Sequence, residues 1–196
     1  MQWHNRNVDD EARENAVNQA LDAVRRGDDG ALASLFDEVY AELAVLAHRQ
    51  RRRWVGQDTL DTSALVHDCF LKLADRDRLG CVDMRHFYAV AAKAMRHILI
   101  DYALRRGTRK RGGDRQRVDL TDAKLAAHAT QETLVAVGVG LDRLAAMDPR
   151  RASVFECRFF LGMGVAETAE TLGISPATVK RDWALAAAFL QVQLEG

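Results

Sequence analysis

The sequence predicts an all-α protein made of two small helical domains joined by a flexible linker. Apolar residues recur every three or four positions over long segments, as they do along one face of a helix. Valine, isoleucine and threonine are scattered rather than alternating, and only 2 prolines occur in 196 residues. Hydrophobic residues make up 48 % of the chain, which is enough to form a buried core.

Four helical segments are predicted in an N-terminal domain, residues 1–106. The first segment ends at Gly27, because glycine commonly closes a helix. The third begins with a cluster of helix-capping side chains, Asp61, Thr62 and Ser63. The fourth ends in a strongly basic sequence. The four segments cover residues 9–27, 30–53, 61–75 and 83–106.

A polar linker is predicted at residues 107–130, where glycines interrupt the helical pattern. The sequence that leads into this linker is strongly basic, although the net charge of the whole chain is zero. Between Lys93 and Arg117 there are nine basic and two acidic side chains, a net charge of +7, so the rest of the chain carries −7. A dense basic strip attracts phosphate groups, and we therefore expect contact with nucleic acid.

The C-terminal domain, residues 131–196, is predicted to end in a helix-turn-helix. Gly173 stands where the end of a helix needs left-handed backbone. Ser175 is placed as the N-cap of the next helix, and Pro176 fits its first position. Two helices therefore meet across a turn of about three residues. The helical segments of this domain cover residues 131–146, 150–161, 165–172 and 176–194.

The last helix separates into two faces. Its inward face is predicted to consist of Val179, Trp183, Ala186, Ala187 and Leu190. Its outward face, near the N-terminal end, carries Ala177, Thr178, Lys180, Arg181 and Ala184. Small side chains allow close approach to a thymine methyl group, and cations donate to guanine or phosphate. An ordinary αα-hairpin is the alternative for this stretch. From Glu132 onward the net charge is −2, which predicts weak binding to DNA by this domain alone.

Catalytic and metal-binding motifs are not indicated. The 3 cysteines, Cys69, Cys81 and Cys157, are far apart and form no C-x-x-C pair, and the 6 histidines form no cluster. No phosphate-binding loop, dinucleotide fingerprint or nucleophile elbow occurs. We therefore expect no enzyme activity, no metal and no cofactor. No apolar run approaches the roughly 20 residues of a membrane span and no signal-peptide pattern is present, so a cytoplasmic protein is expected.

From about Asn15 the chain resembles the bacterial RNA polymerase sigma factors of the extracytoplasmic-function (ECF) group. LFDEVYAELAVLAHRQ (35–50) is similar to region 2.1, and TSALVHDCFLKLAD (62–75) to region 2.2. HFYAVAAKAMRHILIDYALRRGTRKRGG (86–113) is similar to regions 2.3 and 2.4. FECRFFLGMGVAETAETLGISPATVKRDW (155–183) is similar to region 4. The four stretches occur in the order and spacing of that family.

The resemblance implies a transcription initiation factor that binds core RNA polymerase and promoter DNA. Two alternatives are open for its control: an anti-sigma protein that clamps the two domains together, or regulated expression. Contact with core polymerase would fall on Asp61, Leu65, Val66, Asp68, Cys69, Phe70 and Lys72. Recognition of the −10 element would fall on Phe87, Tyr88, Lys93, Arg96, His97, Arg105, Arg106, Arg109, Lys110 and Arg111. Recognition of the −35 element would fall on Ser175, Ala177, Thr178, Lys180, Arg181 and Ala184.

Several alternatives remain open at this point. Core packing within the helical bundle is as suitable as contact with a partner for four apolar residues: Leu65, Phe70, Leu71 and Phe87. The chain could also be a stand-alone helix-turn-helix regulator whose N-terminal domain senses a ligand or dimerises. The basic strip argues against that reading, because a sensor domain does not need nine cations at its end.

Overall fold

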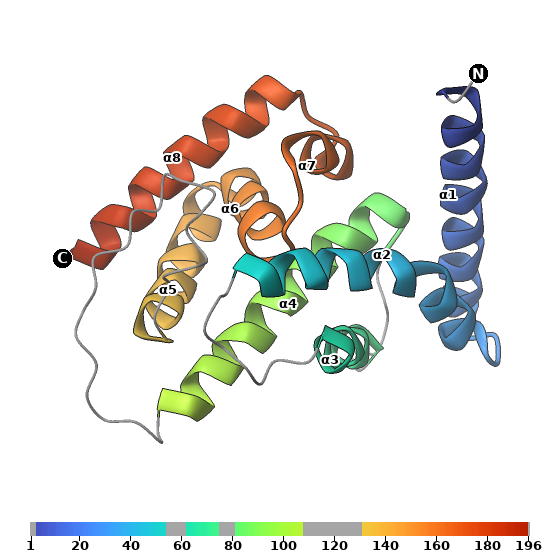
Figure 1. Ribbon diagram of the computed structural model, residues 1–196, viewed down its shortest axis with the longest axis horizontal. Coiled ribbons are helices and arrows are strands. Elements are labelled where there is room, and N and C mark those ends of the chain that lie inside the picture. Colours follow the sequence, from blue (N-terminus) through green and yellow to red (C-terminus); the bar gives the residue numbers. More distant parts are fainter. Residues whose placement is uncertain (1–2, 54–61, 75–80, 108–130, 196) are drawn as a thin grey trace.

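The computed structural model describes residues 3–53, 62–74, 81–107 and 131–195 (Figure 1). Helices account for nearly all of these residues and no strand occurs among them, which confirms the all-α prediction. Within the same ranges no helix is both long enough and apolar enough to cross a bilayer. The helices are α1 (Trp3–Arg26), α2 (Ala31–Arg53), α3 (Thr62–Ala74), α4 (Met84–Gly107), α5 (Gln131–Met147), α6 (Pro149–Phe155), the π-helical turn η2 (Glu156–Phe160), α7 (Val165–Leu172) and α8 (Pro176–Glu195).

The helix boundaries agree closely with the predicted segments, with two differences. Helix α1 begins at Trp3, six residues before the predicted start. The segment predicted as 150–161 divides into α6 and η2, with α6 beginning one residue earlier. Asp148 caps α6, because its carboxylate accepts a hydrogen bond from the backbone N–H of Arg151 at 3.1 Å. The predicted linker beyond Gly107 and the predicted cap residue Asp61 lie outside the described residues.

The N-terminal helices α1–α4 bury a core of leucines and aromatic rings. Phe36 of α2 packs on Phe70 of α3 with ring centroids 4.4 Å apart, which joins these two helices. Phe87 and Met95 place the centre of α4 in the same core. Burial of such side chains contributes about 25 cal/mol per Å² of apolar surface, so this core is the main stabilising element of the N-terminal half.

The C-terminal helices α5–α8 pack around aromatic side chains from α6 and α8. The Trp183 ring of α8 stacks on Phe155 of α6, with centroids 4.9 Å apart and planes 12° apart. Val179, one turn before Trp183, is also buried. The predicted inward face of this helix is therefore confirmed, since all five of its residues are buried: Val179, Trp183, Ala186, Ala187 and Leu190.

The two halves share one continuous core along α4. Figure 1 shows α4 crossing the molecule between α3 on one side and the C-terminal helices on the other. Helix α4 contacts α3 as well as α5, η2 and α7. At the contact with α5, a Cβ added to Gly138 would lie 2.4 Å from Cδ1 of Ile100, so only a glycine allows this approach without a shift of the isoleucine. The sequence predicted two domains, and the structure packs them against each other.

Candidate functional site

The turn between α7 and α8 has the geometry that its sequence predicts. Gly173 has φ +63°, the left-handed conformation, and the N–H of Ile174 donates to the carbonyl of Ala169 at 3.0 Å. Ser175 caps α8, because its Oγ accepts from the backbone N–H of Thr178 at 3.1 Å. Three residues, 173–175, separate the two helices. These bonds fix the direction in which α8 leaves the turn.

The outward face of α8 is exposed as predicted. Thr178 is half-buried, and its hydroxyl lies 2.9 Å from that of Ser175. The other five residues of the predicted −35 set are exposed: Ser175, Ala177, Lys180, Arg181 and Ala184. The N-terminal turns of α8 thus present small side chains next to cations, the combination that can enter a DNA groove.

A buried carboxylate lies directly beneath this face. Asp182 is fully buried, yet it accepts hydrogen bonds from Nε of Arg150 at 2.7 Å and from Nε of Arg181 at 3.2 Å. Burial alone would raise the pKa of Asp182, but the two arginines outweigh it and hold the pKa below its ordinary value. Sequence reasoning missed Arg150, because nothing in the pattern connects a residue of α6 with a helix that begins 26 positions later.

Three of the residues predicted to recognise the −10 element lie in the core instead. Phe87, Tyr88 and Arg96 are all buried on α4. The Tyr88 hydroxyl donates to Glu42 of α2 at 2.7 Å, and Glu42 is also ion-paired with Arg13 of α1 at 2.7 Å. In this arrangement neither aromatic ring is available for stacking on a base, because both complete the packing of the N-terminal helices.

Arg96 joins the two halves of the molecule. Only 3 % of its surface is exposed, and its guanidinium donates to Glu156 Oε1 at 2.8 Å and to the Gly138 carbonyl at 3.1 Å. It also pairs with Asp142 of α5. Burial raises the pKa of Glu156, and the nearby Arg96 guanidinium lowers it only in part. In this arrangement Arg96 serves an internal ion pair rather than a phosphate.

The remaining predicted −10 residues lie on the accessible part of α4 or beyond it. Lys93 and Arg105 are exposed, and His97 is half-buried. The side chain of Arg106 lies outside the described residues, as do three further predicted cations: Arg109, Lys110 and Arg111.

Helix α3 separates the predicted polymerase-binding set into a buried and an exposed part. Its apolar members are buried: Leu65, Val66, Cys69 and Phe70. Asp68 and Lys72 are exposed, and the Lys72 ammonium pairs with Asp101 of α4 at 2.8 Å. Leu71, which was not in the predicted set, is 49 % exposed on the same face, so core packing is confirmed for Leu65 and Phe70 and is wrong for Leu71. The buried stripe at 65, 66, 69, 70 and 73 is the signal that places Leu71 on the opposite side.

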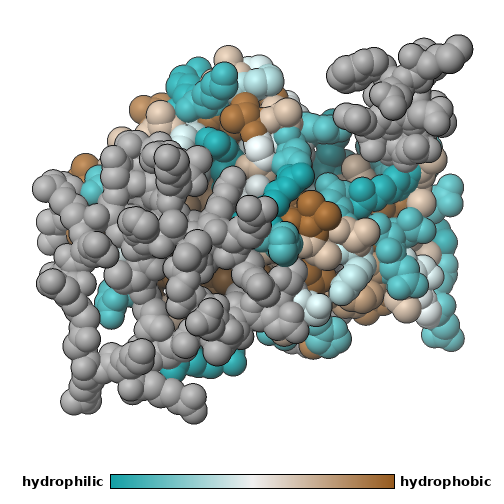
Figure 2. All heavy atoms as spheres, viewed as in Figure 1, coloured by the Kyte–Doolittle hydropathy of each residue, from teal (hydrophilic) through white to brown (hydrophobic). Residues whose placement is uncertain are grey.

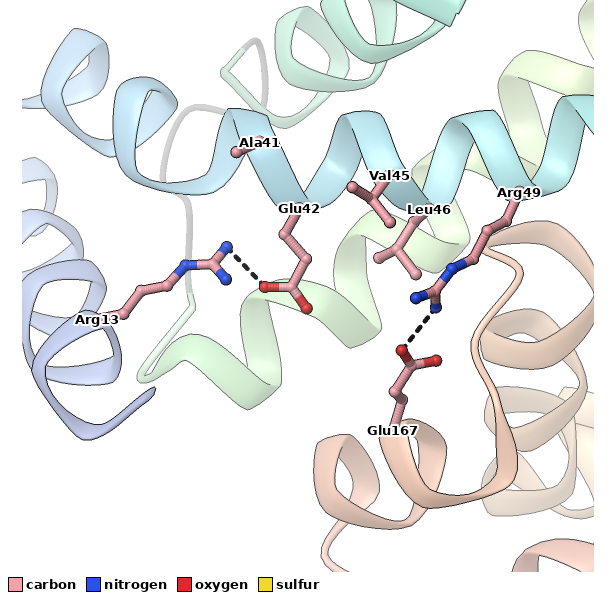
Figure 3. A pocket seen from close by; sticks show the side chains of 7 residues that line it. All are labelled: Arg13, Ala41, Glu42, Val45, Leu46, Arg49 and Glu167. Atoms are coloured by element: carbon pink, nitrogen blue, oxygen red, sulfur yellow. Dashed lines mark hydrogen bonds and ion pairs between the residues drawn. The ribbon is translucent and has the colours of Figure 1, made fainter. Parts of the chain in front are cut away.

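Two cavities adjoin these surfaces without suggesting catalysis. A cavity of about 240 Å³ lies between α1, α2 and α7, and its polar side chains are engaged in ion pairs (Figure 3). There Arg49 of α2 binds Glu167 of α7 at 2.6 Å. A groove of about 280 Å³ between α3 and α4 is lined by Asp68, Leu71, Lys72, Ile98, Asp101, Tyr102 and Arg105. On the face shown in Figure 2, apolar areas among the described residues are small and separated by hydrophilic ones.

No group of residues suited to a metal ion occurs in the described parts of the chain. The cysteines are separate and buried. Burial raises the pKa of Cys69 and of Cys157 to about 12, and that of Cys81 to about 11. Thiols with such pKa values are protonated at neutral pH and are poor nucleophiles and ligands.

Comparison with known proteins identifies the family. A family model described as ECF sigma factor matches residues 14–196. No curated protein and no solved structure gives a significant match. The matched range includes α2–α8 and α1 from Glu14 onward. The chain therefore belongs to the ECF sigma factors, a family that acts in the initiation of transcription.

Proposed function

We propose that this chain binds core RNA polymerase and directs it to promoters by recognising a −35 and a −10 element. The observation that carries the proposal is the presentation of α8. Val179 and Trp183 on its inward side are buried in the core, whereas Lys180 and Arg181 are exposed on the outward side. Ser175 caps the N-terminus of the helix. A helix held in this way can be inserted into a major groove without loss of its own packing.

The −35 element would be read by the first two turns of α8. Ala177 and Ala184 leave room for a base edge, and Lys180 and Arg181 can donate to guanine or to phosphate. The C-terminal unit has a net charge of −2, which limits its non-specific affinity for DNA. Stable promoter binding would therefore require the polymerase and a second point of contact.

The second point of contact would be the basic strip that begins on α4. Lys93 and Arg105 are exposed there, and the strip as a whole carries +7. Because Phe87 and Tyr88 are buried and cannot stack on bases, −10 binding would rest on these cations and on the basic sequence that follows α4.

The polymerase would dock on the exposed face of α3. Asp68 offers a carboxylate to basic side chains, and Leu71 adds apolar area next to it. An apolar side chain with charged neighbours fits a protein–protein contact in which apolar area is buried and the charges lie at a polar rim. The buried residues of α3 would act indirectly, because they hold this face in place.

Run-off transcription with purified core polymerase on a library of genomic fragments tests the proposal. The wild-type chain should give start-site-specific transcripts, and it should shift the same fragments only weakly without polymerase. Replacing Lys180 and Arg181 with alanine should reduce initiation that depends on the −35 element and leave polymerase binding unchanged. Asp68→Ala should weaken polymerase binding in a pull-down.

Arg143→Ala is the matched control for loss of an exposed cation. Arg143 lies on α5, where it donates to Gln193 at 2.6 Å, away from the outward face of α8. Its replacement should leave transcription unchanged. Tight binding to a palindromic site by the chain alone would contradict the proposal and favour a stand-alone regulator.

A further inference from the structure

We propose that Asp182 is a positioning residue that holds Arg150 and Arg181 side by side as a phosphate-binding platform flanking the recognition face of α8. The inference rests on the proposed −35 function. It adds a residue from α6 to the DNA contacts and gives the buried carboxylate of α8 a role in binding.

The geometry of the three side chains carries the proposal. Asp182 is fully buried, and both of its carboxylate oxygens are engaged: Oδ2 with Arg150 at 2.7 Å and Oδ1 with Arg181 at 3.2 Å. The arginine side chains remain 49 % and 62 % exposed. Two cations from different helices are thus held by one carboxylate.

Both arginines bind Asp182 through Nε, so the terminal nitrogens of both guanidiniums are available to bind another group. Each arginine binds Asp182 through Nε, and no other hydrogen bond to either guanidinium is found among the described residues. Each guanidinium has five N–H donors, so the terminal nitrogens of both can donate elsewhere. This planar arrangement fits phosphate oxygens, which arginine can bind in a bidentate manner.

The charge of the cluster favours a phosphate over a base as the target. Two arginines and one aspartate leave a net charge of +1, in a unit that carries six basic and eight acidic side chains from Glu132 onward. Arg150 belongs to α6 and therefore lies beside α8 rather than at its tip. Contacts of this kind set the register and orientation of a recognition helix, while base contacts supply the sequence preference.

A purely structural role for Asp182 makes different predictions. In that case the aspartate would only tie α6 to α8, and the exposed terminal nitrogens would not affect DNA binding. Arg150→Met distinguishes the two roles, because it removes one cation of the platform and leaves the Arg181–Asp182 bond in place.

The experiment uses the full chain bound to core polymerase and a promoter fragment recovered by run-off transcription. Binding is measured by fluorescence anisotropy at several salt concentrations, with the fragment and with a copy whose −35 sequence is replaced. Arg150→Met should weaken binding about fivefold and reduce the slope of log K against log salt by about 0.9, the value for one phosphate contact. The ratio of affinities for the two fragments should stay unchanged, because phosphate contacts carry no sequence information.

Asp182→Asn should weaken binding by about tenfold, since it removes the charge that holds both arginines. The double variant Arg150→Met/Asp182→Asn should bind the promoter fragment at most about twofold more weakly than Asp182→Asn does, because both changes act on one platform. Arg143→Met, an exposed cation of α5, is the control and should leave affinity and slope unchanged. Urea midpoints of all variants show whether each one is folded.

An unchanged salt slope in a folded Arg150→Met variant would overturn the proposal. So would full additivity of the two substitutions. Failure of the underlying −35 function would look different, because the wild-type chain would then bind both fragments equally tightly.

Discussion

Replacing Arg96 with methionine should destabilise the folded protein by about 3–5 kcal/mol, the usual cost of removing one partner of a buried ion pair. Such a loss lies in the upper part of the range of unfolding free-energy changes found for single substitutions. Arg96 is 3 % exposed and Glu156 1 %, so the substitution leaves a carboxylate with almost no access to water. Methionine preserves most of the apolar stem, and the loss therefore reports the charge rather than a cavity.

Urea unfolding followed by circular dichroism measures this effect. With an m-value of about 2 kcal/mol per M, the midpoint should fall by roughly 1.5–2.5 M. Arg49→Met is the matched control, because Arg49 and Glu167 also join the two halves at 2.6 Å but remain 48 % and 41 % exposed. An exposed pair contributes about 0–1 kcal/mol, so this midpoint should move by no more than roughly 0.5 M.

The pH dependence of the same variant tests the role of Glu156. Burial raises the pKa of this carboxyl above its ordinary value, and the Arg96 guanidinium opposes that rise. Without Arg96 the pKa of Glu156 rises further, because only the opposing interaction is lost. A carboxyl with a raised pKa binds its proton more tightly in the folded state, so its contribution to stability grows as the pH falls through that pKa. The cost of Arg96→Met should therefore be largest at pH 7–8 and smaller at pH 5.

Two outcomes would refute this reasoning. A loss below about 1 kcal/mol in Arg96→Met would mean that the pair is solvated and that the two halves do not pack as described. The same conclusion would follow if the double variant Arg96→Met/Glu156→Leu were no more stable than Arg96→Met, since removal of both charges should recover most of the loss.

Three further predictions concern other parts of the molecule. Gly138→Val should destabilise the α4–α5 contact by about 1–3 kcal/mol through overpacking, and Ile100→Ala should partly rescue it, because the added Cβ would lie 2.4 Å from the isoleucine Cδ1. Thermal unfolding of the two single variants and the double variant measures this, and an additive loss would contradict it. Ser175→Ala should cost about 1 kcal/mol in the same assay through loss of the 3.1 Å cap bond, whereas Ser175→Asn should retain most of the stability. A thiol reagent at pH 8 should label none of the 3 cysteines in the native protein and all of them in urea. Burial is the reason, because it raises the pKa of each thiol to about 11–12. Rapid labelling of the native protein would show that the core opens.

Most of the helices and the turn before α8 could be predicted from sequence, because their signals are local. Gly173 and Ser175 determine the turn through their own backbone and side-chain bonds. The two faces of α8 follow from helical spacing, and all of the predicted inward residues are buried. The membership of the ECF family was likewise expected from the order of four stretches, and the family match confirms it.

The positions that sequence reasoning could not place depend on contacts between distant segments. Arg96 has the sequence context of a DNA-binding cation, and only the approach of Glu156, 60 positions later, makes it an internal one. Arg150 is another such case, because only the fold brings its Nε within 2.7 Å of Asp182 on α8. The sequence positions of Phe87 and Tyr88 are compatible with the core and with stacking on bases. Helical spacing does not decide between the two, because it does not show that α4 is covered by other helices on several sides.

The burial of α4 between the two halves has a consequence for domain dissection. A fragment ending near Gly107 would lose the partners of Arg96 and expose Ile100, while a fragment beginning near Gln131 would leave Glu156 and Gly138 uncovered. The first fragment would gain a solvent-exposed Arg96 guanidinium but lose the cations beyond Gly107, among them Arg109, Lys110 and Arg111, so its affinity for DNA would fall below that of the intact chain. Measurements on isolated halves would thus understate both the affinity for DNA and the stability, so the intact chain is the unit in which promoter recognition has to be measured.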